Sequence, residues 1–284
     1  MANDDFQIHD IDPSLHNEDL APLPPSKRNW GWFEIFNVWS NDIQSLFGYT
    51  LAATLFISYG LSGWAVLGGI VLAGFIVMGL VQLTGKPSVK YGIPFPVMAR
   101  SSMGVRGANF PAVVRGIVAI FWYGVQTYFA STAVALLLNA VLESPADAAT
   151  FLGMTTVGWV SYCLVCAFQV MLFVRGMAWI TRFLNWAGPL VYVVMIALML
   201  IIWYQAGPSL WNELGSIFSG TGEYKTGPVA AFFAVVGTMV AYFAAVVINY
   251  GDFARFVTNE KQMTKGNFLA DCLGNYRRHC GGLW

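Results

Sequence analysis

The stretch from Asn109 to Tyr128 holds the side chains that are best suited to bind a small solute. Trp122 and Gln126 lie four residues apart in it, so on a helix they project from the same face. A flat indole and an amide that both donates and accepts hydrogen bonds suit a planar ring rich in N–H and C=O groups. Packing of both side chains between helices is the alternative, and this stretch alone favours packing.

The elements that hold these residues must lie in lipid. The 284-residue chain is 57% hydrophobic and only 11% charged, with a mean hydropathy of +0.58, whereas soluble domains carry about 25% charged residues. A net charge of zero gives no indication of a nucleic-acid partner. The only histidines, His9, His16 and His279, are too scattered for a zinc site, and Cys163 and Cys166 are interpreted as small core residues.

Six apolar spans are each long enough to cross about 30 Å of hydrocarbon. In lipid each must be mostly helical, because its backbone groups have no water to bind. We expect an all-α polytopic membrane protein with a cytoplasmic N-terminal tail over 1–29, a transmembrane domain over 30–269 and an atypical C-terminal tail over 270–284. The expected helices cover 33–60, 62–83, 110–142, 157–174, 177–205 and 228–250.

The basic residues favour one orientation in the inner (plasma) membrane. The tail lacks the basic start and apolar centre of a secretory signal, which places the N-terminus in the cytoplasm. Of the 15 Lys and Arg residues, only Lys225 then falls outside. The others lie in cytoplasmic segments: Lys27, Arg28, Lys86, Lys90, Arg100, Arg106, Arg115, Arg175, Arg182, Arg255, Lys261, Lys265, Arg277 and Arg278.

The first span has a polar centre. The sequence WSNDIQS, from Trp39 to Ser45, places Asp42 near the middle of the bilayer, where a carboxylate usually faces a cavity or a partner. Ser, Asn and Asp side chains compete with helical hydrogen bonds, which makes a local break plausible. A broken helix exposes carbonyl oxygens that can hold a small cation. The alternative is a polar patch buried against a neighbouring helix.

Three long stretches resemble the nucleobase:cation symporter family of permeases for cytosine, uracil, allantoin and hydantoins. They are NEDLAPLPPSKRNWGWFEIFNVW near the start, KYGIPFPVMARSSMGVRGANFPAVVRGIVAIFWYGVQTY in the middle and INYGDFARF after the sixth span. The resemblance covers about residues 17–269. Within the family, SNDIQS and YFAAVVINYGDF are most similar to the allantoin and uracil permeases.

The resemblance implies a five-plus-five inverted-repeat fold with broken first and sixth helices, which works by alternating access. It implies that Trp122 and Phe243 stack on the substrate, with Gln126, Tyr242 and Gln44 beside it. It also implies that the backbone carbonyls of Ser40 and Ile43 bind sodium; whether Na⁺ or H⁺ is the coupling ion, and whether Asp42 takes part, stays open. No other cofactor is expected.

The chain departs from the family pattern after the sixth span, where five or six further helices are expected. We therefore expect a chain truncated after the sixth helix. Its last residues, ADCLGNYRRHCGGLW, do not form the seventh apolar span that the family pattern has near this point. The leading hypothesis is a cation-coupled transporter of a nucleobase-like solute. The alternative is a membrane fragment that does not transport by itself, and an embedded enzyme is a weak third hypothesis because no catalytic set is recognisable.

Overall fold

The computed structural model describes residues 16–142, 150–220 and 227–275. Most of the N-terminal tail, Lys225, and the C-terminal residues with His279 and Cys280 lie outside these ranges. The helices are η1 Glu18–Leu20, η2 Pro25–Lys27, α1 Trp32–Ile43, α2 Leu46–Ser58, α3 Gly63–Tyr91, α4 Phe95–Gly107, α5 Asn109–Leu142, α6 Thr156–Val174, α7 Met177–Ala206, α8 Ser209–Ser219, α9 Pro228–Ala254 and α10 Glu260–Asn275. A short hairpin joins β1 (Thr150–Phe151) to β2 (Met154–Thr155) before α6.

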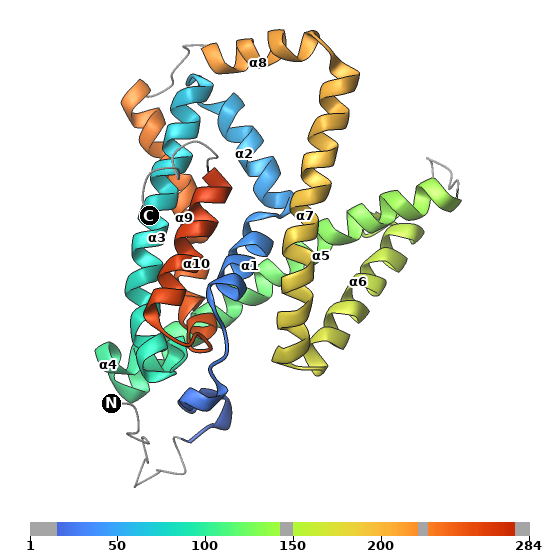
Figure 1. Cartoon of the computed structure of the whole chain (residues 1–284). Coiled ribbons are helices and arrows are strands. Elements are labelled where there is room, and N and C mark those ends of the chain that lie inside the picture. The colour runs from blue at the N-terminus through green and yellow to red at the C-terminus, as the bar shows by residue number, and fades with distance from the viewer. Residues whose placement is uncertain (1–15, 143–149, 221–226, 276–284) are drawn as a thin grey trace.

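Five of the described helices, α3, α5, α6, α7 and α9, are long and apolar enough to cross a membrane, and the chain is a multi-pass membrane protein. They account for five of the six expected spans. The first expected span is present as two shorter helices, α1 and α2, with a break between them. Figure 1 shows α3 and α9 close together, α7 on the other side of α1, and α5 and α6 running obliquely away from this group.

The break in the first span follows from its polar residues. α1 ends at Ile43, Gln44 leaves the helical conformation with φ −83° and ψ 62°, and α2 begins at Leu46. The Ser45 hydroxyl accepts a hydrogen bond from the Gly48 amide at 3.0 Å, which caps the new helix. The same hydroxyl lies 3.1 Å from the Tyr242 hydroxyl of α9. The competition that we predicted from this sequence therefore ends one helix and starts another.

The tightest part of the core lies between α3 and α9. Gly85 of α3 allows Tyr250 of α9 and Met263 of α10 to approach, since a Cβ there would lie 2.5 Å from the Tyr250 ring and 2.7 Å from the Met263 sulfur. Tyr250 and Met263 are fully buried. In lipid, small residues at such crossings let helices pack closely. The pair α3 and α9 thereby forms a fixed wall against which α1 lies.

Two helices are more continuous than we expected. α9 runs unbroken through Tyr242 and Phe243, although the family resemblance implies an interruption there. Its centre, AYFAAVV, contains no Pro, Ser, Asn or Asp that would compete with the helix. α3 continues past Pro87 to Tyr91, beyond the expected end at residue 83, because the segment after the proline is packed: Ser88 and Val89 are buried.

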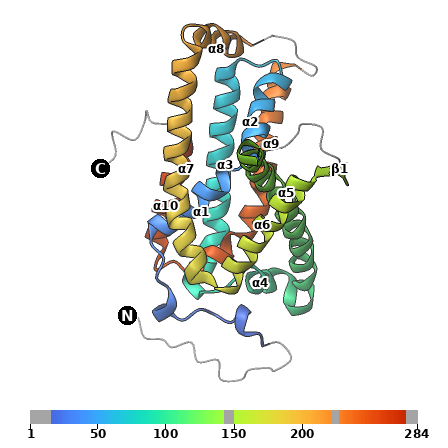
Figure 2. The same ribbon diagram turned by 90° about the vertical axis from the view of Figure 1, so that its right-hand side faces the viewer.

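Shorter helices lie at the ends of this group. α4 forms in the proline- and glycine-rich segment after α3, and α8 lies across the opposite end (Figure 2). α10 was not expected as an element; it packs on α1 and α3. The N-terminal segment is fixed to this end of the molecule, since the Trp30 amide donates to the Phe256 carbonyl at 2.9 Å and the Arg28 guanidinium donates to the Val89 carbonyl at 2.7 Å.

Candidate functional site

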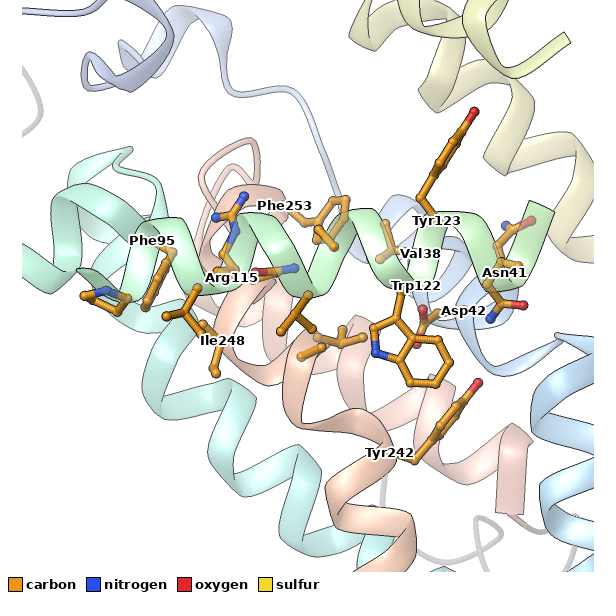
Figure 3. Close-up of a pocket in the computed structure, with 18 of the residues that line it drawn as sticks. Val38, Asn41, Asp42, Phe95, Arg115, Trp122, Tyr123, Tyr242, Ile248 and Phe253 are labelled. Carbon is orange, nitrogen blue, oxygen red and sulfur yellow. The ribbon is translucent and has the colours of Figure 1, made fainter. Parts of the chain in front are cut away.

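A cavity of about 790 Å³ lies between α1, α5 and α9, with single contributions from α4 and α6 and two residues from α7. This volume falls in the range of about 300–1,000 Å³ that is typical of small-molecule sites. Figure 3 shows Trp122, Asp42 and Tyr242 close together below α5, whereas Tyr123 points away from them. Those with polar atoms are Asn41, Asp42, Arg115, Trp122, Tyr123, Gln126, Gln169, Tyr242 and Asn249.

The aromatic end of the cavity is built around Trp122. Its indole meets Tyr242 edge-on, with ring centroids 5.8 Å apart and planes at 80°, and meets Phe47 of α2 at 5.1 Å and 79°. Phe47 in turn stacks on Tyr242 at 5.8 Å and 24°. These three rings contact one another, so α2 and α9 both help to hold the indole in place. Both contacts are perpendicular, so neither neighbour stacks flat on the indole.

Polar groups lie next to these rings. Asp42 lies beside the indole in Figure 3, where the α1 helix approaches its break. Gln126 interacts with the Tyr242 hydroxyl, and Gln169 accepts a hydrogen bond from Thr127 at 3.1 Å. Amides and a carboxylate beside an aromatic surface can hydrogen-bond the edge of a ring that stacks there.

Asn249 also lines this wall. Its Oδ1 is buried and has no hydrogen-bond partner among the described residues. A buried, unpaired polar atom typically costs about 1–3 kcal/mol. Because this oxygen is fully buried, a solute in the cavity does not reach it without a movement of the neighbouring side chains.

The opposite end of the cavity is charged. Arg115 of α5 forms an ion pair with Asp252 of α9, and the other oxygen of Asp252 accepts a hydrogen bond from the Phe95 amide of α4 at 2.9 Å. The Arg115 guanidinium also lies 5.9 Å from the Phe95 ring centroid. α4, α5 and α9 are thus joined at this end by one carboxylate.

The structure brings Trp122, Gln126 and Tyr242 together, but it does not place Phe243 with them. Consecutive residues on a helix point about 100° apart, so Phe243 faces away and meets Trp39 edge-on at 6.2 Å. The stacking partner that we expected opposite Trp122 is therefore not at this cavity. Gln44 also lines no part of it, and instead accepts a hydrogen bond from the Tyr49 hydroxyl.

The two expected cation ligands lie at the end of α1. The Ser40 carbonyl accepts a hydrogen bond from the Gln44 amide at 3.3 Å, and the Ile43 carbonyl accepts one from the Ser45 amide at 3.0 Å. A carbonyl oxygen has two lone pairs, so each can still contact a cation. Among the described residues, no group of three or more His, Cys, Asp or Glu side chains could hold a metal ion.

Sequence reasoning did not assign Arg115, Gln169, Asn249 or Asp252 to the site. A helical spacing was available for two of them, because Arg115 precedes Trp122 by seven residues and Asn249 follows Tyr242 by seven. Residues seven apart share a helix face, so the cavity-facing sides of α5 and α9 could have been extended by two turns. Gln169 could be placed only by knowing how α6 packs.

Comparisons with known proteins identify the family of this chain. Residues 22–276 match the family model described as permease for cytosine/purines, uracil, thiamine and allantoin. The allantoin permease of Bacillus subtilis (strain 168) is 36% identical over 259 residues, which cover 89% of this chain and 52% of that protein. The purine-uracil permease NCS1 of Arabidopsis thaliana is 29% identical over 90% of this chain and 42% of its own length.

A solved structure shows the fold. Mhp1, a nucleobase-cation-symport-1 family transporter in a closed conformation with bromovinylhydantoin bound, matches with a TM-score of 0.70 at 22% identity, covering 90% of this chain and 53% of Mhp1. Its inward-facing conformation matches with a TM-score of 0.64. The chain therefore has the helical transporter fold of Mhp1, and it spans about half the length of the relatives it matches.

Proposed function

Because the chain belongs to the family of permeases for cytosine/purines, uracil, thiamine and allantoin, we propose that it acts in cation-coupled uptake of a planar nucleobase or related solute by alternating access. The solute class is uracil, allantoin, hydantoin or cytosine. The observation that carries the proposal is the cavity in which Trp122 lies with Gln126, Tyr242 and Asp42 between membrane-spanning helices.

In this proposal the solute stacks on a face of the Trp122 indole. Gln126 reads its edge, because an amide can pair with an N–H and a C=O group at once. Tyr242 supplies a hydroxyl from α9, and Asp42 supplies an acceptor for N–H groups. Phe243 and Gln44 lie outside this cavity, where Phe243 contacts Trp39 and Gln44 accepts a hydrogen bond from Tyr49.

The coupling ion is Na⁺ or H⁺. For Na⁺, the backbone carbonyls of Ser40 and Ile43 supply two of the several oxygen ligands that such an ion needs, and the remaining ligands come from elsewhere. The proposed location is the inner (plasma) membrane with the N-terminus in the cytoplasm. The basic segments around α4 and between α6 and α7 then face the cytoplasm, and α8 faces the outside.

The test is uptake of radiolabelled allantoin and uracil by a bacterial strain that lacks its own carriers. The chain is expressed alone and together with the C-terminal half of the Bacillus subtilis allantoin permease, because it spans about half of that relative. We expect saturable uptake in one of these settings and its loss in Trp122→Ala at equal membrane levels. The control is Phe121→Ala, because Phe121 is the neighbouring residue in the chain and its side chain is 66% exposed.

Two results would contradict the proposal. One is uptake that Trp122→Ala leaves unchanged, and the other is no uptake in either setting by protein that is present in the membrane. Uptake only with the second half would show that the residues described here need further helices in order to transport.

A further inference from the structure

Asp42 of α1 is a charged side chain of the cavity that has no partner in the protein. It lies beside the Trp122 indole (Figure 3) and is half-buried. Among the described residues it forms no hydrogen bond and no ion pair. Neither of its oxygens is fully buried, so a solute in the cavity can reach both of them.

The hydrogen-bond donors near Asp42 are engaged elsewhere. Asn41, the preceding residue, donates from Nδ2 to backbone carbonyls of α1 and α7 at 2.7 and 3.1 Å. The Tyr242 hydroxyl lies 3.1 Å from the serine hydroxyl at the break after α1. The lone pairs of the Asp42 carboxylate are therefore left for a bound solute.

The charge of Asp42 is not offset by a cation in the described lining of the cavity. Arg115 also lines it, but Arg115 forms an ion pair with Asp252. Arg115 precedes Trp122 by seven residues, which separates the two by about 10 Å along α5. A carboxylate in a largely apolar site is costly unless it is paired and hydrogen-bonded. Asp42 therefore favours a solute that brings N–H donors to both of its oxygens.

We propose that Asp42 selects ring solutes that present two neighbouring N–H donors on one edge. The two carboxylate oxygens lie side by side, and a pair of parallel N–H groups meets them in the bidentate arrangement that carboxylates form with guanidinium groups. An amino group next to a ring N–H supplies such a pair. This inference rests on the proposed function, in which the ring stacks on Trp122, and it names the edge that the cavity favours.

Two rings of equal size differ in this edge. Isocytosine is uracil with the 2-oxo group replaced by an amino group, so a ring N–H lies next to an NH₂ group. Uracil has a carbonyl oxygen between its two N–H groups, and this oxygen would lie against the carboxylate. Hydrogen bonds to a charged acceptor are about twice as strong as neutral ones. The cavity should therefore distinguish clearly between the two rings.

The test is isothermal titration calorimetry of isocytosine and uracil with the full chain purified in detergent. We expect isocytosine to bind at least about tenfold more tightly than uracil, since one hydrogen bond to a charged group is worth at least that factor. Asp42→Asn should lower this ratio at least about tenfold, because its amide offers one donor and one acceptor and so matches the C=O and N–H groups of uracil. Asp42→Ala, which removes the carboxylate without adding a donor, should also lose the preference.

The control is Glu213→Gln, which makes the same change of a carboxylate to an amide at an exposed position of α8, outside the cavity. It should change neither affinity by more than about twofold. Equal binding of the two rings by the wild-type chain would overturn the inference, and this comparison does not depend on the folding of any variant. A ratio that stays unchanged in Asp42→Asn or Asp42→Ala would overturn it as well.

The remaining outcomes separate this inference from the proposed function. An equal loss of affinity for both rings in Asp42→Asn would overturn the inference, because Asp42 would then act on the coupling ion or the fold. If both rings bind equally and Trp122→Ala weakens both, the substrate cavity stands and only the role of Asp42 falls. The same holds if neither ring binds while allantoin does. If none of the three binds, both proposals fall.

Discussion

At the scale of single residues, the account depends on how Trp122 and Gln126 are held. Trp122 is fixed by edge contacts with Phe47 and Tyr242, and Gln126 lies one helical turn away against the Tyr242 hydroxyl. A side chain that is positioned before the solute arrives loses less conformational entropy when it binds. These contacts therefore favour binding of the solute, in addition to setting the shape of its site.

Gln126→Leu keeps the size of the side chain and removes its hydrogen bonds. We expect the KM for uptake to rise by about tenfold, because one lost hydrogen bond of about 1.4 kcal/mol corresponds to that factor. The same substitution at the exposed Gln205, at the end of α7, should leave KM unchanged. An equal KM in wild type and Gln126→Leu would show that Gln126 does not contribute to binding of the solute.

The sequence allowed Trp122 and Gln126 to be placed together because i, i+4 spacing on one helix determines which residues share a face. Gln169 could not be placed, since its position at the cavity depends on how α6 packs against α5. Phe243 shows the limit of a resemblance: the helix places it one position away from Tyr242, toward Trp39. Which of the two faces the solute depends on the local path of α9, which its residue types alone did not determine.

At the scale of helices, the close approach of α3 to α9 and α10 depends on Gly85. Gly85→Ala should destabilise the protein by about 1–3 kcal/mol, because its methyl group would overlap Tyr250 and Met263. The control is Gly79→Ala in the same helix, where a Cβ meets nothing within 4 Å and alanine favours the helix by up to about 1 kcal/mol. The check is the unfolding midpoint of the purified variants, and equal midpoints for the two would contradict this packing.

The break after Ile43 was predictable, since Ser, Asn and Asp cluster there and Ser45 becomes the cap of α2. The unbroken α9 was predictable as well, because its own central residues favour a helix; the expectation of a break came from the resemblance. The continuation of α3 past Pro87 was missed. One proline removes a single hydrogen bond, and the burial of Val89 together with the hydrogen bond from the Gly92 amide to the Ser88 carbonyl at 2.8 Å offsets that loss.

At the scale of the whole molecule, the helix ends that carry basic residues gather at the end of the bundle where α4 lies, and α8 lies at the other (Figure 1). After replacing the four native cysteines with serine, we expect Ser102→Cys in α4 to react with a membrane-impermeant maleimide only in inside-out vesicles. Ser216→Cys in α8 should react in intact cells. Both positions are exposed, and the reverse pattern would invert the proposed orientation.

The measurement that tests the central claim most directly is equilibrium binding of radiolabelled allantoin, hydantoin, uracil and cytosine to the purified chain. We expect saturable binding of at least one of them, weakened at least about tenfold in Trp122→Ala through loss of the stacking surface. Binding should change less than about twofold in Phe121→Ala, whose ring lies outside the cavity. Equal affinity in wild type and Trp122→Ala, or no binding of any of the four, would contradict a substrate site at this cavity.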